Sequence, residues 1–207
     1  MTDSHDARNR VTRFFIFFGL FLVVPIIGTI LHEVGHYIAA IVQGYEAEIY
    51  YAFCSSTISP SLDPAQYFIF IVGGPTATWI QSLIPFFLLL ILYPKERRES
   101  FDGKYPASFM FLMAFASFAG RFVFNAGGYI LQGSPNMDEV KMANYLGLPE
   151  AVFVYLFGVI GIAVLLGLIY IIPKRDRITV TLSCILGSVS GYLLWYEFLG
   201  PLIMPVT

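Results

Sequence analysis

The sequence predicts an all-α polytopic membrane protein with about five transmembrane helices. Apolar residues make up 57% of its 207 residues, whereas charged residues make up only 13%. This composition leaves too little polar surface for a water-soluble globule. The apolar residues also fall into five runs, each long enough to cross roughly 30 Å of hydrocarbon as a helix. These runs cover about residues 11–42, 65–93, 107–131, 151–172 and 178–199.

The connections between the runs are short, and the sequence shows no internal repeat and no segment that could form a separate soluble core. We therefore predict one membrane-embedded domain over residues 1–207. The first three runs are expected to form its core, about residues 12–146, and the last two, about residues 150–200, are expected to be accessory helices. The first run is too long for a cleavable signal core, so we expect it to remain as an anchor.

Charged residues are divided between the two sides of the predicted bundle. Lys and Arg near the ends of spans stay in the cytoplasm and so indicate orientation. Basic residues precede the first run and occupy the connections between runs two and three and between runs four and five: Arg8, Arg10, Arg13, Lys95, Arg97, Arg98, Lys104, Lys174, Arg175 and Arg177. The opposite connections contain Glu46, Glu48, Asp63, Asp138, Glu139 and Glu150, with Lys141 as their only basic residue. This predicts an integral protein of the cell membrane, surrounded by the lipid bilayer, with a cytoplasmic N-terminus and an external C-terminus. It gives no support to nucleic-acid binding.

The connection between the first two runs, residues 44–60, is rich in β-forming residues and too polar to span a membrane. We predict a short β-hairpin or a re-entrant strand there. An exposed strand edge could hold a peptide in an extended conformation, although the aromatic residues Tyr50, Tyr51 and Phe53 would equally suit an interfacial anchor. Cys54 in this connection and Cys184 in the last run are predicted at opposite membrane faces, so no disulfide is expected.

The segment His32-Glu33-Val34-Gly35-His36 lies inside the first apolar run. In a helix, residues four apart share one face, so both imidazoles can reach one metal ion while Glu33 projects beside it. Ionisable groups within a span are costly and therefore indicate function. We predict a zinc site with His32 and His36 as ligands and Glu33 as general base. The structural alternative is a polar cluster that joins helices through hydrogen bonds.

A catalytic zinc ion usually has three protein ligands and leaves one position for water. Spans one and three both run outwards, so the two histidines and the residues just after span three are expected on the same side. We therefore expect Asp138 to be the third ligand, because the third histidine, His5, lies at the opposite end of span one. Asp138 and Glu139 also suit the first turn of a short helix to about residue 146, capped by Ser134 or Asn136.

In the second run, Gly73-Gly74-Pro75 is followed by Thr78. This segment is expected to interrupt helical hydrogen bonding and to allow close backbone approach. Irregular backbone within a membrane suits the wall of a site, because protein or a water-filled cavity must satisfy it. A packing kink of small residues is the alternative.

In the third run, Arg121 and Asn125 lie one helical turn apart. An arginine within a span should face the bundle and find a partner. We predict a structural ion pair between Arg121 and Glu197, and we expect Asn125 to line the cavity of the site and contact substrate.

Residues 32–36, 73–75 and 138 resemble, in this order, the motifs of the site-2 protease family of intramembrane zinc metalloproteases. That family combines a membrane-embedded HExxH motif, a later Gly-Pro motif and an aspartate ligand in a third core helix. The resemblance covers about residues 20–140. It implies a three-helix catalytic core, a bound Zn²⁺ and cleavage of a transmembrane protein substrate within or near the bilayer.

The same resemblance places Gly73, Gly74, Pro75 and Thr78 beside the substrate, and Thr78 stands where the family often has an asparagine that helps to hold it. Well-known members carry the metal towards the cytosolic side of the membrane. In this chain the charges place His32 and the rest of its motif towards the outside. Either the chain belongs to a distinct branch or its orientation is the reverse of the one that the charges predict.

Two other classes of protein fit the same residues. One is a non-enzymatic membrane protein, either a pseudoprotease that binds client helices or a metal-binding transporter. The complete His-Glu-His set argues against the first, and the shortage of further ionisable residues along the spans argues against the second. The other is a membrane metalloprotease that processes prenylated protein C-termini, with Glu139 as the third ligand. The apolar faces of the spans give no indication of oligomeric state.

Overall fold

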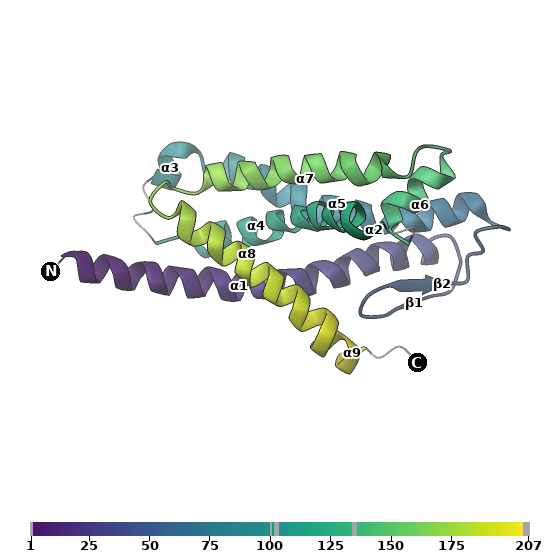
Figure 1. Cartoon of the computed structure of the whole chain (residues 1–207), viewed down its shortest axis with the longest axis horizontal. Coiled ribbons are helices and arrows are strands. Elements are labelled where there is room, and N and C mark those ends of the chain that lie inside the picture. Colours follow the sequence, from purple (N-terminus) through teal and green to yellow (C-terminus); the bar gives the residue numbers. More distant parts are fainter. Residues whose placement is uncertain (1, 100, 102–103, 134–135, 205–207) are drawn as a thin grey trace.

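A computed structural model describes residues 2–99, 101, 104–133 and 136–204 and, for residues 2–9, the backbone alone, so that the side chain of His5 lies outside the description. The helices and strands follow one another along the chain as drawn in Figure 1. In order they are α1 (Thr2–Ile41), β1 (Ala47–Ile49), β2 (Cys54–Ser56), α2 (Pro64–Leu92), α3 (Lys95–Glu99), α4 (Ala107–Ala116), the 3₁₀ turn η1 (Ser117–Ala119), α5 (Gly120–Gln132), α6 (Asp138–Tyr145), α7 (Ala151–Ile171), α8 (Arg177–Leu193), the π-helical turn η2 (Leu194–Leu199) and α9 (Gly200–Ile203).

Five helical stretches are long and apolar enough to cross a membrane, and they coincide with the five predicted runs to within a few residues. They are Arg10–Ile41, Pro64–Leu92, Ala107–Gln132, Ala151–Ile171 and Arg177–Ile203. The described part of the chain is mostly helical. This confirms the predicted class of an all-α chain with five apolar helices and one small antiparallel sheet.

Helix α2 is continuous through Gly73-Gly74-Pro75, so the predicted interruption of the second run is wrong. Apolar helices tolerate an internal proline when neighbouring helices cover the freed backbone groups. Here the small residues serve close packing instead, because α1 crosses α2 at this level. A Cβ atom on Gly73 would overlap the carbonyl oxygen of Gly35 and lie 2.9 Å from the Cβ atom of Ala39.

Helix α8 crosses α1 obliquely and packs against it (Figure 1), and two of its glycines make this contact possible. A Cβ atom on Gly187 would lie 2.6 Å from the carbonyl oxygen of Phe18, and one on Gly191 would overlap the carbonyl oxygen of Leu22. Close contact between backbones is a common way for helices to associate in a membrane, where the apolar effect gives little help. Helix α1 is therefore held between α2 on one side and α8 on another.

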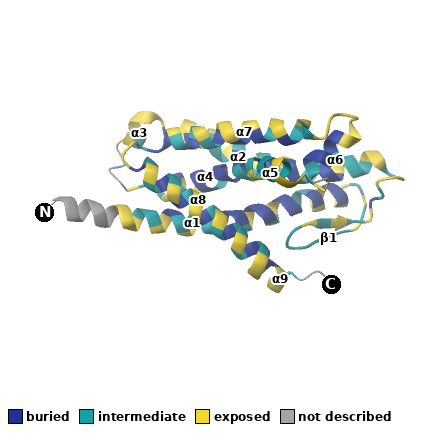
Figure 2. Cartoon of the chain, viewed as in Figure 1, coloured by how far each residue is buried: buried dark blue, intermediate teal, exposed yellow. Residues whose placement is uncertain are grey.

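The main apolar core lies between α1, α4, η1, α7 and α8, and it includes Phe17, Phe21, Phe109 and Leu168. Figure 2 shows buried residues along the parts of α1 that the other helices cover, whereas α7 is exposed on its outward side. At the end of the bundle that holds α3, a buried polar contact joins α1 to the α7–α8 connection. Asp176 accepts a hydrogen bond from the hydroxyl of Tyr105 at 2.6 Å and lies 3.4 Å from Nη2 of Arg13.

The opposite end of the bundle holds the hairpin and α6 (Figure 1). Strands β1 and β2 pair antiparallel, with Ala47 opposite Ser56 and Ile49 opposite Cys54, which confirms the predicted hairpin. The indole Nε1 of Trp195 donates to the carbonyl oxygen of Tyr51 at 2.8 Å and so attaches η2 to the hairpin.

The short helix predicted after span three is present as α6, but its cap differs from the prediction. The N-cap position is occupied by Met137, which makes no side-chain capping hydrogen bond, and not by Asn136. Ser134, the other expected cap, lies outside the described residues. Cys54 and Cys184 are both free thiols, as predicted.

Candidate metal centre

His32 and His36 lie one turn apart on the face of α1 that α2 covers. Both are buried, with 2% and 4% of their surface exposed. Their Nε2 atoms are 3.3 Å apart, so both imidazoles point to the same place. This confirms the geometry that the spacing of the two histidines predicts.

Asp138, the first residue of α6, brings a carboxylate to the same point. Its Oδ2 atom lies 3.1 Å from Nε2 of His32 and 3.1 Å from Nε2 of His36. Donor atoms around a tetrahedral zinc ion, each about 2.0–2.2 Å from the metal, lie about 3.3–3.6 Å apart. The three donors thus form a nearly equilateral triangle of about the right size for one face of such a site. They are the only group of three or more metal-binding side chains within the described part of the chain.

Each imidazole is oriented by a hydrogen bond from its other nitrogen to α2. Nδ1 of His36 donates to the backbone carbonyl oxygen of Phe70 at 2.7 Å, and Nδ1 of His32 lies 2.8 Å from the hydroxyl oxygen of the fully buried Thr78. Such outer contacts fix the tautomer of a ligand histidine and direct its free nitrogen at the metal. Thr78, predicted beside the substrate, is therefore placed where it orients His32.

The hydrogen bond to Phe70 determines which nitrogen of His36 carries a hydrogen. A carbonyl oxygen can only accept, so Nδ1 of His36 carries a hydrogen, and in the neutral ring Nε2 presents its lone pair to Asp138. Two lone pairs 3.1 Å apart repel each other unless a positive charge lies between them. Although burial raises the pKa of Asp138, protonation of the histidines at Nε2 reverses this effect, because the charge of His36 and the hydrogen bonds from both rings lower that pKa below its ordinary value. The donor set therefore requires a cation or a proton at its centre.

Gly74 gives the site its open space on the side of α2. A Cβ atom there would overlap Nε2 of His36 and lie 2.6 Å from Nε2 of His32. Any side chain at position 74 would thus overlap the two Nε2 atoms that form two corners of the donor triangle. Of the segment Gly73-Gly74-Pro75, it is Gly74 that forms the wall of the site, while Gly73 forms the close contact between α1 and α2.

Glu33 lies beside the histidines without joining their donor triangle. It is 3% exposed, and its Oε1 atom is 3.9 Å from Nη2 of Arg121. The backbone amide of Cys54 on β2 also approaches this carboxylate. The predicted ion pair between Arg121 and Glu197 is therefore wrong, because among the described residues the guanidinium is paired with Glu33. The reason is which helices face each other, since α5 places Arg121 against α1 at the level of the motif.

Glu139 and Asn125 form a second polar contact behind Asp138. Nδ2 of Asn125 donates to Oε1 of Glu139 at 3.0 Å, and Glu139 is 2% exposed. Burial and then the charge of Asp138 raise the pKa of Glu139 above its ordinary value. Of the two neighbouring carboxylates, Asp138 reaches the histidines and Glu139 holds Asn125, which was predicted to contact substrate.

No protein-family model matches this chain, and neither a curated protein nor a solved structure matches it.

Proposed function

We propose that this chain is a zinc-dependent intramembrane endopeptidase similar to the site-2 proteases. The observation that carries the proposal is the position of Glu33, a buried carboxylate beside a converging His-His-Asp donor set and outside it. A merely structural metal site is usually closed by four protein ligands and has no use for such a group. The setting among five apolar helices supports a membrane-protein substrate.

Zinc fits the donors, since two imidazoles and one carboxylate leave a fourth position open. When bound there, it would polarise a scissile carbonyl group and lower the pKa of an adjacent water molecule towards about 7. Glu33 would take the proton from that water and return it to the leaving amine. Arg121 would favour the ionised form of Glu33 before the first step and so prepare it to accept the proton.

The hairpin supports the handling of an extended peptide. Tyr50 N–H donates to the carbonyl oxygen of Phe53, and Thr57 N–H donates to that of Glu46. In an antiparallel pair, hydrogen-bonded and non-hydrogen-bonded residue pairs alternate. The backbone groups of Cys54 and Ser56 therefore point away from β1, along the edge where the Cys54 amide approaches Glu33. A substrate strand added to this edge would pass beside the donor triangle.

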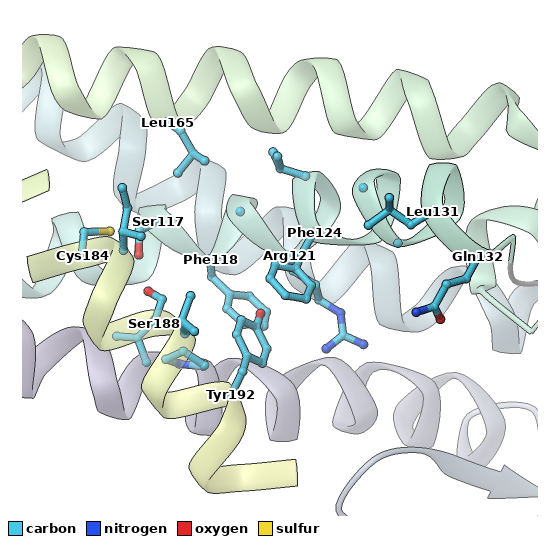
Figure 3. A pocket seen from close by; sticks show the side chains of 18 residues that line it. Ser117, Phe118, Arg121, Phe124, Leu131, Gln132, Leu165, Cys184, Ser188 and Tyr192 are labelled. Carbon is cyan, nitrogen blue, oxygen red and sulfur yellow. The ribbon is translucent and has the colours of Figure 1, made fainter. Parts of the chain in front are cut away.

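A cavity of about 530 Å³ supports the approach of an apolar segment. It lies between α5 and α8 above α1, and apart from Arg121 its lining is largely apolar (Figure 3). Arg121 belongs both to the lining of this cavity and to the ion pair with Glu33, and Figure 3 shows it reaching from α5 towards α1. A transmembrane segment lodged in the cavity would thus be adjacent to the general base.

Filling this cavity should reduce cleavage and spare the metal. A Cβ atom on Gly127, which lines the cavity, meets nothing within 4 Å, so Gly127→Leu should fold and project into the space. We expect cleavage of a single-span reporter in liposomes to fall about tenfold to a hundredfold through misplacement of the substrate, with metal content unchanged. Gly19→Leu on α1, also in open space but outside the cavity, is the matched control. Equal rates for the two variants would exclude this route.

The metal content of the purified chain tests the site itself. We expect about one zinc ion per chain in the wild type, and its loss in His36→Ala and Asp138→Asn. Glu139→Gln is the matched control, because Glu139 is not one of the three metal-binding side chains and the glutamine can still accept the hydrogen bond from Asn125. Loss in Glu139→Gln with retention in Asp138→Asn would instead favour the ligand set expected for processing of prenylated proteins. Zinc at the site without cleavage of transmembrane or prenylated substrates would favour a non-enzymatic metal-binding protein.

A further inference from the structure

A pocket of about 450 Å³ at the end of the bundle opposite the metal centre has a strongly basic lining. It lies between α3, the last turn of α7 and the connection to α8, a region seen at one end of Figure 1. Five basic side chains line it: Lys95, Arg98, Lys174, Arg175 and Arg177. Among the described residues, Glu99 is its one acidic lining residue. The pocket therefore carries a large excess of positive charge.

The acidic residues nearby have partners of their own. Glu99 lies 3.9 Å from Nζ of Lys95 in an exposed pair, and Asp176 is buried between Arg13 and Arg175. Neither is paired with Arg98 or Lys174 in the described part of the chain.

Two donors of the pocket residues lack a partner. The Nε atoms of Arg98 and Arg177 are both buried and have no hydrogen-bond partner among the described residues. Nη2 of Arg177 is used, at 3.3 Å from the carbonyl oxygens of Tyr170 and Ile172, and so covers the negative end of α7. A buried donor without a partner is costly and favours an acceptor from outside the chain.

The depth of the pocket indicates where that acceptor comes from. Helix α2 ends at Leu92, α7 ends at Ile171 and α8 begins at Arg177, so the pocket lies at the ends of three apolar helices. In a bundle that spans a bilayer, this is the level of the lipid headgroups. Guanidinium groups match the geometry of a phosphate, and basic pockets between helix ends are a known way to hold anionic lipids.

We propose that this pocket binds a phosphate group presented by the headgroup of an anionic phospholipid. The proposal does not rest on the proteolytic activity and concerns the other end of the bundle. Its test needs no substrate.

The experiment is native mass spectrometry of the full chain in detergent, titrated with phosphatidylglycerol or with phosphatidylcholine of the same acyl chains. We expect preferential retention of phosphatidylglycerol, and a fall of about tenfold or more in its apparent affinity in Arg98→Gln/Lys174→Gln. Neither side chain has a described partner within the chain, so this variant should fold. Arg10→Gln/Lys104→Gln, which removes the same charge at the same end but outside the pocket, should bind as the wild type does.

Arg98→Lys gives a second comparison, because it keeps the charge and loses the planar fork, and we expect it to bind with intermediate affinity. Equal retention of the two lipids, or an equal loss in the Arg10/Lys104 control, would overturn the proposal. A separate arm replaces lipid by inorganic phosphate and measures thermal stability. Stabilisation by phosphate alone as large as that by phosphatidylglycerol would overturn the assignment to a lipid.

Discussion

Gly74→Ala is expected to abolish metal binding. The new methyl group would overlap Nε2 of His36 and lie 2.6 Å from Nε2 of His32, the two nitrogen donors of the triangle. Neither imidazole can turn away freely, because Phe70 and Thr78 hold the opposite nitrogens. We therefore expect zinc content to fall from about one ion per chain to background, and cleavage to fall with it. Elemental analysis of the purified variant measures this directly.

The control for Gly74→Ala is Gly19→Ala, which makes the same change in α1, where an added Cβ atom meets nothing within 4 Å. It should bind zinc as the wild type does. Thermal unfolding of both variants without metal then shows whether each of them is folded. Full zinc content in a folded Gly74→Ala chain would mean that the donor triangle is not the metal site.

Glu33→Gln is expected to lower the rate of cleavage by about a hundredfold or more while the zinc content is retained, since a general base typically contributes 10²–10⁴-fold. The amide has nearly the shape of the carboxylate but takes up no proton at neutral pH. Cleavage of a single-span reporter in liposomes measures the loss. Glu139→Gln, which replaces a similarly buried carboxylate on α6, should retain activity.

The pairing of Glu33 with Arg121 calls for a second comparison. Glu33→Gln leaves the guanidinium without its partner at 3.9 Å, and an unpaired buried charge destabilises the fold. The double variant Glu33→Gln/Arg121→Gln removes both charges. If Glu33 is the base, the double variant regains stability and stays inactive. Recovery of cleavage in the double variant would show that Glu33 serves only to neutralise Arg121.

The positions of the five helices could be predicted from the sequence because an apolar run of this length crosses a membrane as an α-helix. The continuity of α2 could not. Gly73 and Pro75 are helix breakers in water, and only the neighbouring backbone of α1 explains why they are tolerated here. The partner of Arg121 was likewise beyond the sequence, because similar depth in two spans does not determine which helices face each other.

The donor set was largely predictable, since the spacing of His32 and His36 determines their common face and the order of the spans brings Asp138 to the same end. The contact of His36 with Phe70 was not, because the group involved is a backbone carbonyl and has no side-chain signature. Thr78 and Asn125 were identified as part of the site, yet their observed partners are His32 and Glu139. A polar residue type indicates that a hydrogen bond is needed but does not name its partner.

Because α8 packs against α1, the fold around the three metal-binding side chains is complete only some time after these side chains have been synthesised. All three donors have left the ribosome well before α8 has, because α8, whose Gly187 and Gly191 lie against α1, follows residue 138 in the chain. During biogenesis the nascent chain therefore passes through a stage in which it holds all three metal-binding side chains but lacks α8. This is the helix that packs against α1, which carries His32 and His36. Integration of α8 is then the step that completes the packing around α1.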